Sequence, residues 1–205
     1  MIRRLVQVIA TLSCVALTTG AGAQPANTTK YSYYPVAGDS SNSIYAAMLR
    51  YGPHVNGQKA YAATSATTSQ DGKLVQAESC LVQDYRLKID FVIRLPKIKN
   101  EALLSPADKL RWQEFSRFLK KHEETHRSIW LGCAQEMENQ ARAIHSPTCA
   151  GAEAEAEKLW DQMRQNCAAK HNAFDTAEQK TLMQHPFVKV VMGRKSRGAY
   201  AVKMP

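Results

Sequence analysis

The sequence lacks an apolar run long enough to cross a bilayer. Its one extended apolar stretch, Leu5 to Leu17, is shorter than the roughly 20 residues that a membrane-spanning helix needs. Arg3 and Arg4 precede this stretch, and the small residues Ala21-Gly22-Ala23 follow it, which is the pattern of a secretory signal. We therefore expect residues 1–23 to be a signal peptide cleaved after Ala23, with no transmembrane anchor in the mature chain and a secreted or periplasmic location.

Acidic residues are scarce relative to basic ones. There are 18 Asp and Glu against 27 Lys and Arg, so the net charge is +9. Removal of residues 1–23 takes away only Arg3 and Arg4 and leaves a net charge of about +7, densest between Lys189 and Lys203. No nucleic-acid-binding motif accompanies this charge. We therefore expect no nucleic-acid partner, and the charge is explained by solubility or by an anionic envelope surface.

Cysteine is also sparse, and Cys14 lies in the expected signal peptide. The remaining four form an even set in an oxidising compartment, which favours disulfides over thiolate metal ligands. Cys149 and Cys167 fall on one predicted helix about 27 Å apart, too far for a bridge. Two pairings stay open: Cys80–Cys149 with Cys133–Cys167, or Cys80–Cys167 with Cys133–Cys149.

Helix-breaking residues are missing from Ser105-Pro106 to Ile144, apart from Gly132. A Ser-Pro pair is a good N-cap and first turn. Large apolar residues recur at steps of three and four along this stretch, at Trp112, Phe115, Leu119, Ile129, Cys133, Met137 and Ile144. The pattern predicts one long helix that packs along this stripe.

This helix contains His122-Glu123-Glu124-Thr125-His126. Histidines four apart project side by side, so both imidazoles can bind one Zn²⁺, and a carboxylate after the first can reach the metal-bound water. Both histidines fill gaps in the apolar stripe, so they face whatever the helix packs on. The competing interpretation is a pair of histidines held by hydrogen bonds. Glu124 lies about 100° further round the helix and is expected in solvent.

The residues before the long helix show strand-like alternation. We predict an edge strand at Tyr31–Val36, a short helix at Asn42–Tyr51, a strand-like segment at Lys59–Thr68, a turn at Asp71-Gly72, and one long or two paired strands at Lys73–Leu95, ended by Pro96. The expected fold class is α+β, with a small antiparallel sheet and one short helix in the N-terminal half. For residues 186–205 an edge strand, a flap over the cleft and a disordered tail are all open.

A second long helix is predicted from Cys149 to Asp175 or beyond, after a turn at His145-Ser146-Pro147-Thr148. Two long helices joined by so short a turn lie antiparallel. Residues near 167–175 therefore return alongside the two motif histidines. His171 and Asp175, one helical turn apart, are the candidates for a third metal ligand, and the register count slightly favours His171.

An ordered series of short motifs covers most of the expected mature chain. The series is Tyr34-Pro35-Val36-Ala37-Gly38, Tyr51-Gly52-Pro53, Tyr61-Ala62-Ala63-Thr64, Cys80, Leu95-Pro96, His122-Glu123 with His126, Thr148-Cys149, and Asn172 with Phe174-Asp175. In this series the chain resembles the bacterial family of predicted secreted zinc-dependent proteases catalogued as domain of unknown function 922. The resemblance implies one zincin-like domain over residues 24–185, followed by a basic C-terminal segment.

The same resemblance implies a metal site in which His122, His126 and Asp175 hold Zn²⁺, with His171 as an outer or alternative ligand. It also favours the pairing of Cys80 with Cys149. The sequence departs from the family where relatives carry a His-Gly pair after the aspartate. Lys180-Thr181 stands there, so the group that stabilises an oxyanion would differ in this chain.

These residues together predict an exported zinc-dependent hydrolase, for which a peptide or protein is the default substrate. Zinc held by three protein ligands lowers the pKa of a bound water, and Glu123 takes its proton and passes it to the leaving amine. One alternative is a catalytically inactive metal-binding or interaction domain of the cell envelope. Another is a structural zinc site in which His171 is an additional protein ligand and no water is bound.

Overall fold

The computed structural model describes residues 24–195, so the expected signal peptide and residues 196–205 lie outside the described part of the chain. The fold is α+β, as predicted, with four α-helices, a long sheet and a short hairpin in the described residues. The elements are β1 (Ala26–Val36), α1 (Ser41–Tyr51), β2 (His54–Val55), β3 (Gln58–Lys59), β4 (Ala63–Gln76), β5 (Cys80–Ile98), the 3₁₀ turn η1 (Glu101–Leu103), α2 (Pro106–Arg142), β6 (His145–Ser146), α3 (Cys149–Gln184) and α4 (Pro186–Lys195). None of the helices within residues 24–195 has the length and apolarity that crossing a bilayer requires.

The long sheet has the strand order β1-β5-β4, and β6 pairs with the start of β5. β4 and β5 are antiparallel, whereas β1 runs parallel to β5 from Ala26 beside Lys88 to Val36 beside Ile98. The sheet is therefore mixed, and the prediction of an antiparallel sheet is wrong for β1. Alternation along a strand reports which face is buried and carries no information on the direction of its neighbour.

The predicted turn at Asp71-Gly72 is wrong, because β4 continues through it to Gln76. Asp71 pairs with Arg86, and the register shifts by a bulge before Lys73. The chain reverses instead between the end of β4 and Cys80. A bulge uses the same conformationally free residues as a turn, so the local sequence signal is the same for both.

Pro96 does not end β5, which continues to Ile98. The pairing of β4 with β5 stops at Arg94, so β5 has only β1 beside it at the proline. A strand with one free side tolerates a residue that lacks the N–H group.

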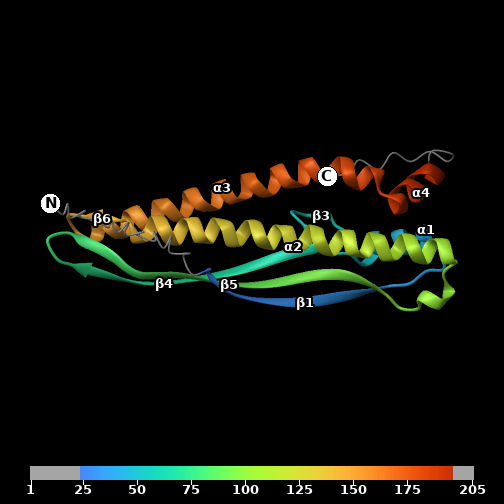
Figure 1. Cartoon of the computed structure of the whole chain (residues 1–205), viewed down its shortest axis with the longest axis horizontal. Helices are drawn as coiled ribbons and strands as arrows, with labels where there is room; N and C mark the ends of the chain where they lie inside the picture. Colours follow the sequence, from blue (N-terminus) through green and yellow to red (C-terminus); the bar gives the residue numbers. More distant parts are fainter. Residues whose placement is uncertain (1–23, 196–205) are drawn as a thin grey trace, which may run out of the picture.

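Three layers stack in Figure 1: the sheet, then α2 along one of its faces, then α3 on the other side of α2. The two long helices form the expected antiparallel hairpin. α2 begins at the predicted Ser105 cap, whose hydroxyl accepts a hydrogen bond from Asp108 N. Of the predicted stripe, Trp112, Phe115, Leu119, Cys133 and Met137 are buried in α2.

The buried residues form two clusters that leave the motif between them. The first joins the N-terminal part of α2 to α1, α4 and the ends of β1 and β5, and includes Phe115 and Leu119. The second joins the C-terminal part of α2 to α3 and the first half of β5, and includes Cys133 and Met137. Residues 122–126 lie on α2 between these clusters, so rigid packing on both sides fixes their position.

α4 packs its first turns into the first cluster. Phe187, Val188 and Val191 are buried, and the Phe187 ring stacks on Phe115 with centroids 4.5 Å apart. His185 precedes the helix, and its Nδ1 accepts a hydrogen bond from Phe187 N. Residues 186–195 are therefore helical and contribute to the core, so within this part of the C-terminal segment none of the three possibilities left open holds. Residues 196–205 of that segment lie outside the described residues.

One disulfide ties the helical hairpin to the sheet, and a second joins the two helices of the hairpin to each other. Cys80 at the start of β5 bonds to Cys149 at the start of α3, and Cys133 of α2 bonds to Cys167 of α3. The prediction of disulfides is confirmed, with the pairing that the family resemblance favoured.

Candidate metal centre

The two motif histidines project from α2 toward α3, and Asp175 of α3 lies opposite them. His122 Nε2 and His126 Nε2 are 3.0 Å apart. Asp175 Oδ1 lies 3.0 Å from His126 Nε2 and 3.4 Å from His122 Nε2. Two imidazole nitrogens and one carboxylate oxygen thus converge on one point, and they are a group able to hold a metal ion.

The three converging atoms have the spacing that zinc requires. A tetrahedral zinc with bonds of about 2.0–2.1 Å holds its ligand atoms roughly 3.3 Å apart. The observed separations of 3.0–3.4 Å match this value. Two histidines and a carboxylate are also a ligand set that catalytic zinc uses, with one position left for water. Asp175 is 51% exposed, so the site has access to solvent.

Each histidine has a second contact on α3, made by the ring nitrogen that faces away from the converging atoms. His122 Nδ1 lies 2.8 Å from Glu178 Oε2, and His126 Nδ1 lies 2.8 Å from His171 Nδ1. His171 is therefore placed behind His126, while Asp175 faces the two Nε2 atoms. Sequence reasoning missed Glu178. The signal available was its spacing, because 171, 175 and 178 share one face of a helix.

Glu123 contacts β4 and is 4% exposed. Its Oε2 accepts a hydrogen bond of 2.8 Å from Thr64 Oγ1 of β4. Burial raises the pKa of Glu123, the Thr64 bond and a charge on His122 oppose that rise, and the charge of Asp175 adds to it. Glu123 is thus within electrostatic range of the converging atoms. Thr64 belongs to the Tyr61-Ala62-Ala63-Thr64 motif, and no pattern in the sequence assigns it a role.

Glu124 is 43% exposed and connects α2 to the sheet. Tyr31 of β1 donates a hydrogen bond of 2.7 Å to Glu124 Oε1, and Lys120 Nζ lies 3.7 Å from the same oxygen. Solvent exposure agrees with the expectation for this residue. Its contacts hold β1 against α2 and do not involve the three converging atoms.

Aromatic rings surround the imidazoles. The Phe174 centroid lies 4.9 Å from that of His122 and 5.2 Å from that of His126, and Trp130 lies 5.5 Å from His171. Burial lowers the pKa of His126 to about 4, against the opposing charge of Asp175. Burial also lowers the pKa of His171. The neutral imidazole is the form that binds metals, and this environment favours the neutral form of His126.

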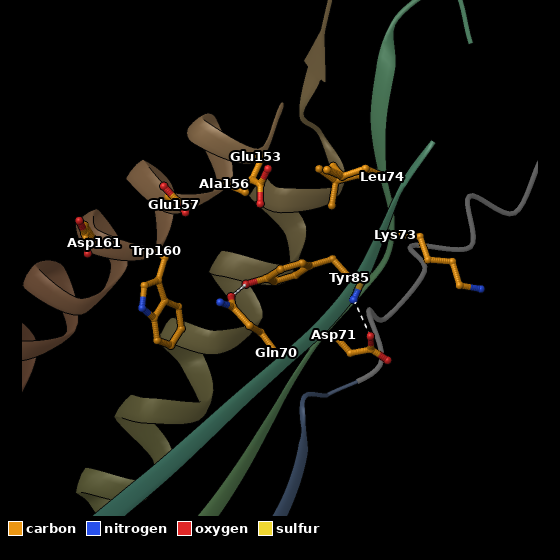
Figure 2. A pocket seen from close by; sticks show the side chains of 12 residues that line it. Gln70, Asp71, Lys73, Leu74, Tyr85, Glu153, Ala156, Glu157, Trp160 and Asp161 are labelled. Carbon is orange, nitrogen blue, oxygen red and sulfur yellow. Dashed lines mark hydrogen bonds between the residues drawn. The ribbon is translucent and has the colours of Figure 1, made fainter. Parts of the chain in front are cut away.

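A hollow of about 510 Å³ lies between the C-terminal half of β4, the N-terminal part of β5 and the N-terminal half of α3 (Figure 2). Tyr85 forms part of its wall, with its hydroxyl bonded to Gln70, and Trp160 and Glu157 face it from α3. None of the three residues that converge on α2 and α3 lines this hollow. The candidate metal centre is therefore separate from the hollow.

The sequence model of a bacterial protein family of unknown function, DUF922, matches residues 31–184. This range runs from the middle of β1 to the end of α3 and includes every residue of the candidate metal centre. No curated protein and no solved structure matches the chain.

Proposed function

The chain belongs to this bacterial family of unknown function, DUF922, and we propose that it is an exported zinc-dependent hydrolase of the zincin type that acts on a peptide or protein. One observation carries the proposal: atoms of His122, His126 and Asp175, from two helices, converge with separations of 3.0–3.4 Å. The donor set and its spacing suit zinc and leave one position of a tetrahedron for a reactant.

Zinc bound there would act as a Lewis acid and lower the pKa of a bound water towards neutrality. His122, His126 and Asp175 would hold the ion. Glu123 would accept the proton released from the water and deliver it to the leaving amine. Because the pKa of Glu123 is raised, its carboxylate is suited both to accepting the proton from the water and to releasing it to the leaving amine. The Thr64 bond to Oε2 restrains the carboxylate and leaves Oε1 for the proton.

The two disulfides support a secreted or periplasmic location. Disulfides persist in oxidising compartments and are rare in the cytosol. Cys80–Cys149 and Cys133–Cys167 account for all the cysteines of the described residues.

The test of this proposal is the variant Glu123→Gln, with Glu124→Gln as its matched control on the same helical turn. We expect the wild type and both variants to bind one zinc per chain, measured by elemental analysis. We expect the wild type and Glu124→Gln to cleave a fluorogenic peptide library, and Glu123→Gln to lose this activity by at least about 100-fold. Equal rates for wild type and Glu123→Gln would remove Glu123 from the mechanism.

One observation favours a second candidate, an inactive metal-binding or interaction domain. The position of the family's His-Gly pair is Lys180-Thr181, and both residues are exposed on α3. The same experiment separates the two candidates, because a wild type that binds zinc and cleaves nothing in the library supports this second one. Structural zinc with His171 as a ligand is less favoured, since His171 Nδ1 faces His126 Nδ1 rather than the converging Nε2 atoms.

A further inference from the structure

Besides Asp175, α3 places two further polar side chains against the histidines of α2. A site with three protein ligands does not need them as ligands. His171 and Glu178 flank Asp175 on one face of the helix and contact the outer ring nitrogens of His126 and His122. We propose that Glu178 and His171 are positioning residues that fix the tautomer and ring orientation of the two ligand imidazoles. This role rests on the metal centre of the proposed function.

The contact of His122 with Glu178 selects one tautomer. A carboxylate only accepts hydrogen bonds, so His122 Nδ1, 2.8 Å from Glu178 Oε2, carries the proton. The neutral ring then has its lone pair on Nε2, the atom that faces Asp175 and His126. The Phe174 ring, with its centroid 4.9 Å from that of His122, limits rotation of the imidazole away from this orientation.

The contact of His126 with His171 gives the same result through a different acceptor. Of two Nδ1 atoms 2.8 Å apart, one donates and the other accepts. If His126 Nδ1 accepted, its proton would lie on Nε2, directed at the other converging atoms, and no metal could bind there. His171 Nδ1 is therefore the acceptor when metal binds, and the proton of His171 lies on Nε2, 3.8 Å from Cys167 Sγ.

The two contacts differ in charge. Glu178 places a negative charge on the outer nitrogen of His122, which makes that imidazole a stronger donor to a cation. His171 is a neutral partner for His126. Loss of an outer partner of this kind typically weakens metal binding by about 10–100-fold. We expect the loss of Glu178 to lie near the upper end of that range and the loss of His171 near the lower end.

The test compares zinc dissociation constants, measured by competition with a chromophoric chelator, for Glu178→Ala, Glu178→Gln and His171→Ala. Glutamine keeps an acceptor oxygen and removes the charge, so the expected order of affinity is wild type, then Glu178→Gln, then Glu178→Ala. Glu157→Gln makes the same charge change on an exposed part of α3, and Asn172→Ala makes a truncation beside His171. Both controls should bind zinc as the wild type does.

Two further readouts separate positioning from a structural role. The unfolding temperature of the zinc-free protein detects loss of stability, and the visible absorption bands of bound Co²⁺ report the ligand geometry. A purely structural role would lower the unfolding temperature and leave zinc affinity and the Co²⁺ spectrum unchanged. Positioning predicts weaker zinc binding and a changed spectrum, with Glu178→Gln as the variant that keeps side-chain volume.

The outcomes distinguish this inference from the proposed function. A wild type that binds no zinc overturns both. A wild type that binds zinc, with Glu178 and His171 variants whose affinities equal those of the controls, overturns the positioning role alone. Weaker binding in the ordered series, at unchanged stability of the zinc-free protein, supports it.

Discussion

Two glutamates of α2, Glu123 and Glu138, have buried carboxylates, and these carboxylates make different contacts. Glu138 is 1% exposed and accepts hydrogen bonds from Leu87 N and Arg142 Nη2 at 2.7 and 2.6 Å. Glu123 is bonded only to Thr64 within the described residues. A fully bonded buried carboxylate serves packing, whereas one with an unused oxygen and a raised pKa is suited to proton transfer.

Replacement of Glu138 by alanine should lower the free energy of unfolding by about 2–4 kcal/mol, because Leu87 N and Arg142 lose a buried acceptor. Urea denaturation of the zinc-free protein measures this. The control is Glu136→Ala, which breaks an exposed pair with Lys170 and a long hydrogen bond from Gln140 Nε2, and it should cost less than about 1 kcal/mol. Zinc affinity should be unchanged in both variants. Equal losses of stability would contradict a packing role for the buried Glu138 carboxylate.

Replacement of Thr64 by valine keeps the shape of the side chain and removes the hydroxyl that bonds Glu123. Loss of one hydrogen bond to a charged group corresponds to about 1.5–3 kcal/mol, so turnover should fall by roughly 10–100-fold while zinc remains bound. Steady-state kinetics on the peptide substrate measures this, with Thr64→Ser as the control that restores the hydroxyl. A valine variant as fast as the serine variant would show that Thr64 has no part in orienting Glu123.

The residues of the site show which interactions a sequence encodes locally. The spacing of His122 and His126 on one helix is fixed by helix geometry alone. The preference for Asp175 over His171 rests on resemblance to a family, because the register between two helices is known from sequence only to within several residues. Glu178 and Thr64 were missed for the same reason, since their partners lie on other elements.

At the scale of elements, the candidate metal centre depends on the register between α2 and α3. The Cys133–Cys167 disulfide joins the two helices, and Cys167 lies one turn before His171. Asp175 and Glu178 follow on the same side of α3. The disulfide therefore fixes the register that places these side chains opposite His122 and His126.

The double variant Cys133→Ala/Cys167→Ala should lose about 3–4 kcal/mol of stability from chain entropy. It should also bind zinc at least about tenfold more weakly, because both outer contacts depend on the register. Cys80→Ala/Cys149→Ala is the matched control at the far end of α3, with its disulfide closing a longer loop. We expect it to lose at least as much stability and to keep its zinc affinity. Equal zinc affinities in the two double variants would contradict a register role.

Strands were predicted less well than helices, and the reasons lie in particular elements. Helix periodicity and capping placed α2 and α3 to within a few residues at their starts, because both signals are local. The bulge at Gly72 and the parallel pairing of β1 depend on the neighbouring strand, which local patterns do not contain. α4 is short and its Phe187-Val188 pair suits a strand as well as a buried helix, so only its partner Phe115 decides.

Replacement of Phe187 by alanine tests whether α4 belongs to the core. The side chain is fully buried against Phe115, so its loss should cost about 3–5 kcal/mol. Lys189→Ala, at an exposed position of the same helix, should change stability by less than about 0.5 kcal/mol. Thermal unfolding measures both. A Phe187 variant as stable as the lysine variant would show that α4 is dispensable.

At the scale of the whole molecule, the candidate centre bridges two helices between two separate apolar clusters. A ligand that binds only the folded state stabilises it, and zinc at 100 times its dissociation constant contributes about 2.7 kcal/mol. Removal of zinc with a chelator should therefore lower the unfolding temperature of the wild type. The variant His126→Ala should unfold at a temperature that the chelator does not change. A wild type that is also insensitive would argue against a metal bridge.

The parallel pairing of β1 with β5 has a consequence for the order of folding. Thr28 contacts Asp90, 62 residues later in the chain, so the first strand has no partner until β5 has been synthesised. Such high contact order slows the search for the native topology. The β4–β5 hairpin is local and can form first, and β1 is then added to its β5 edge.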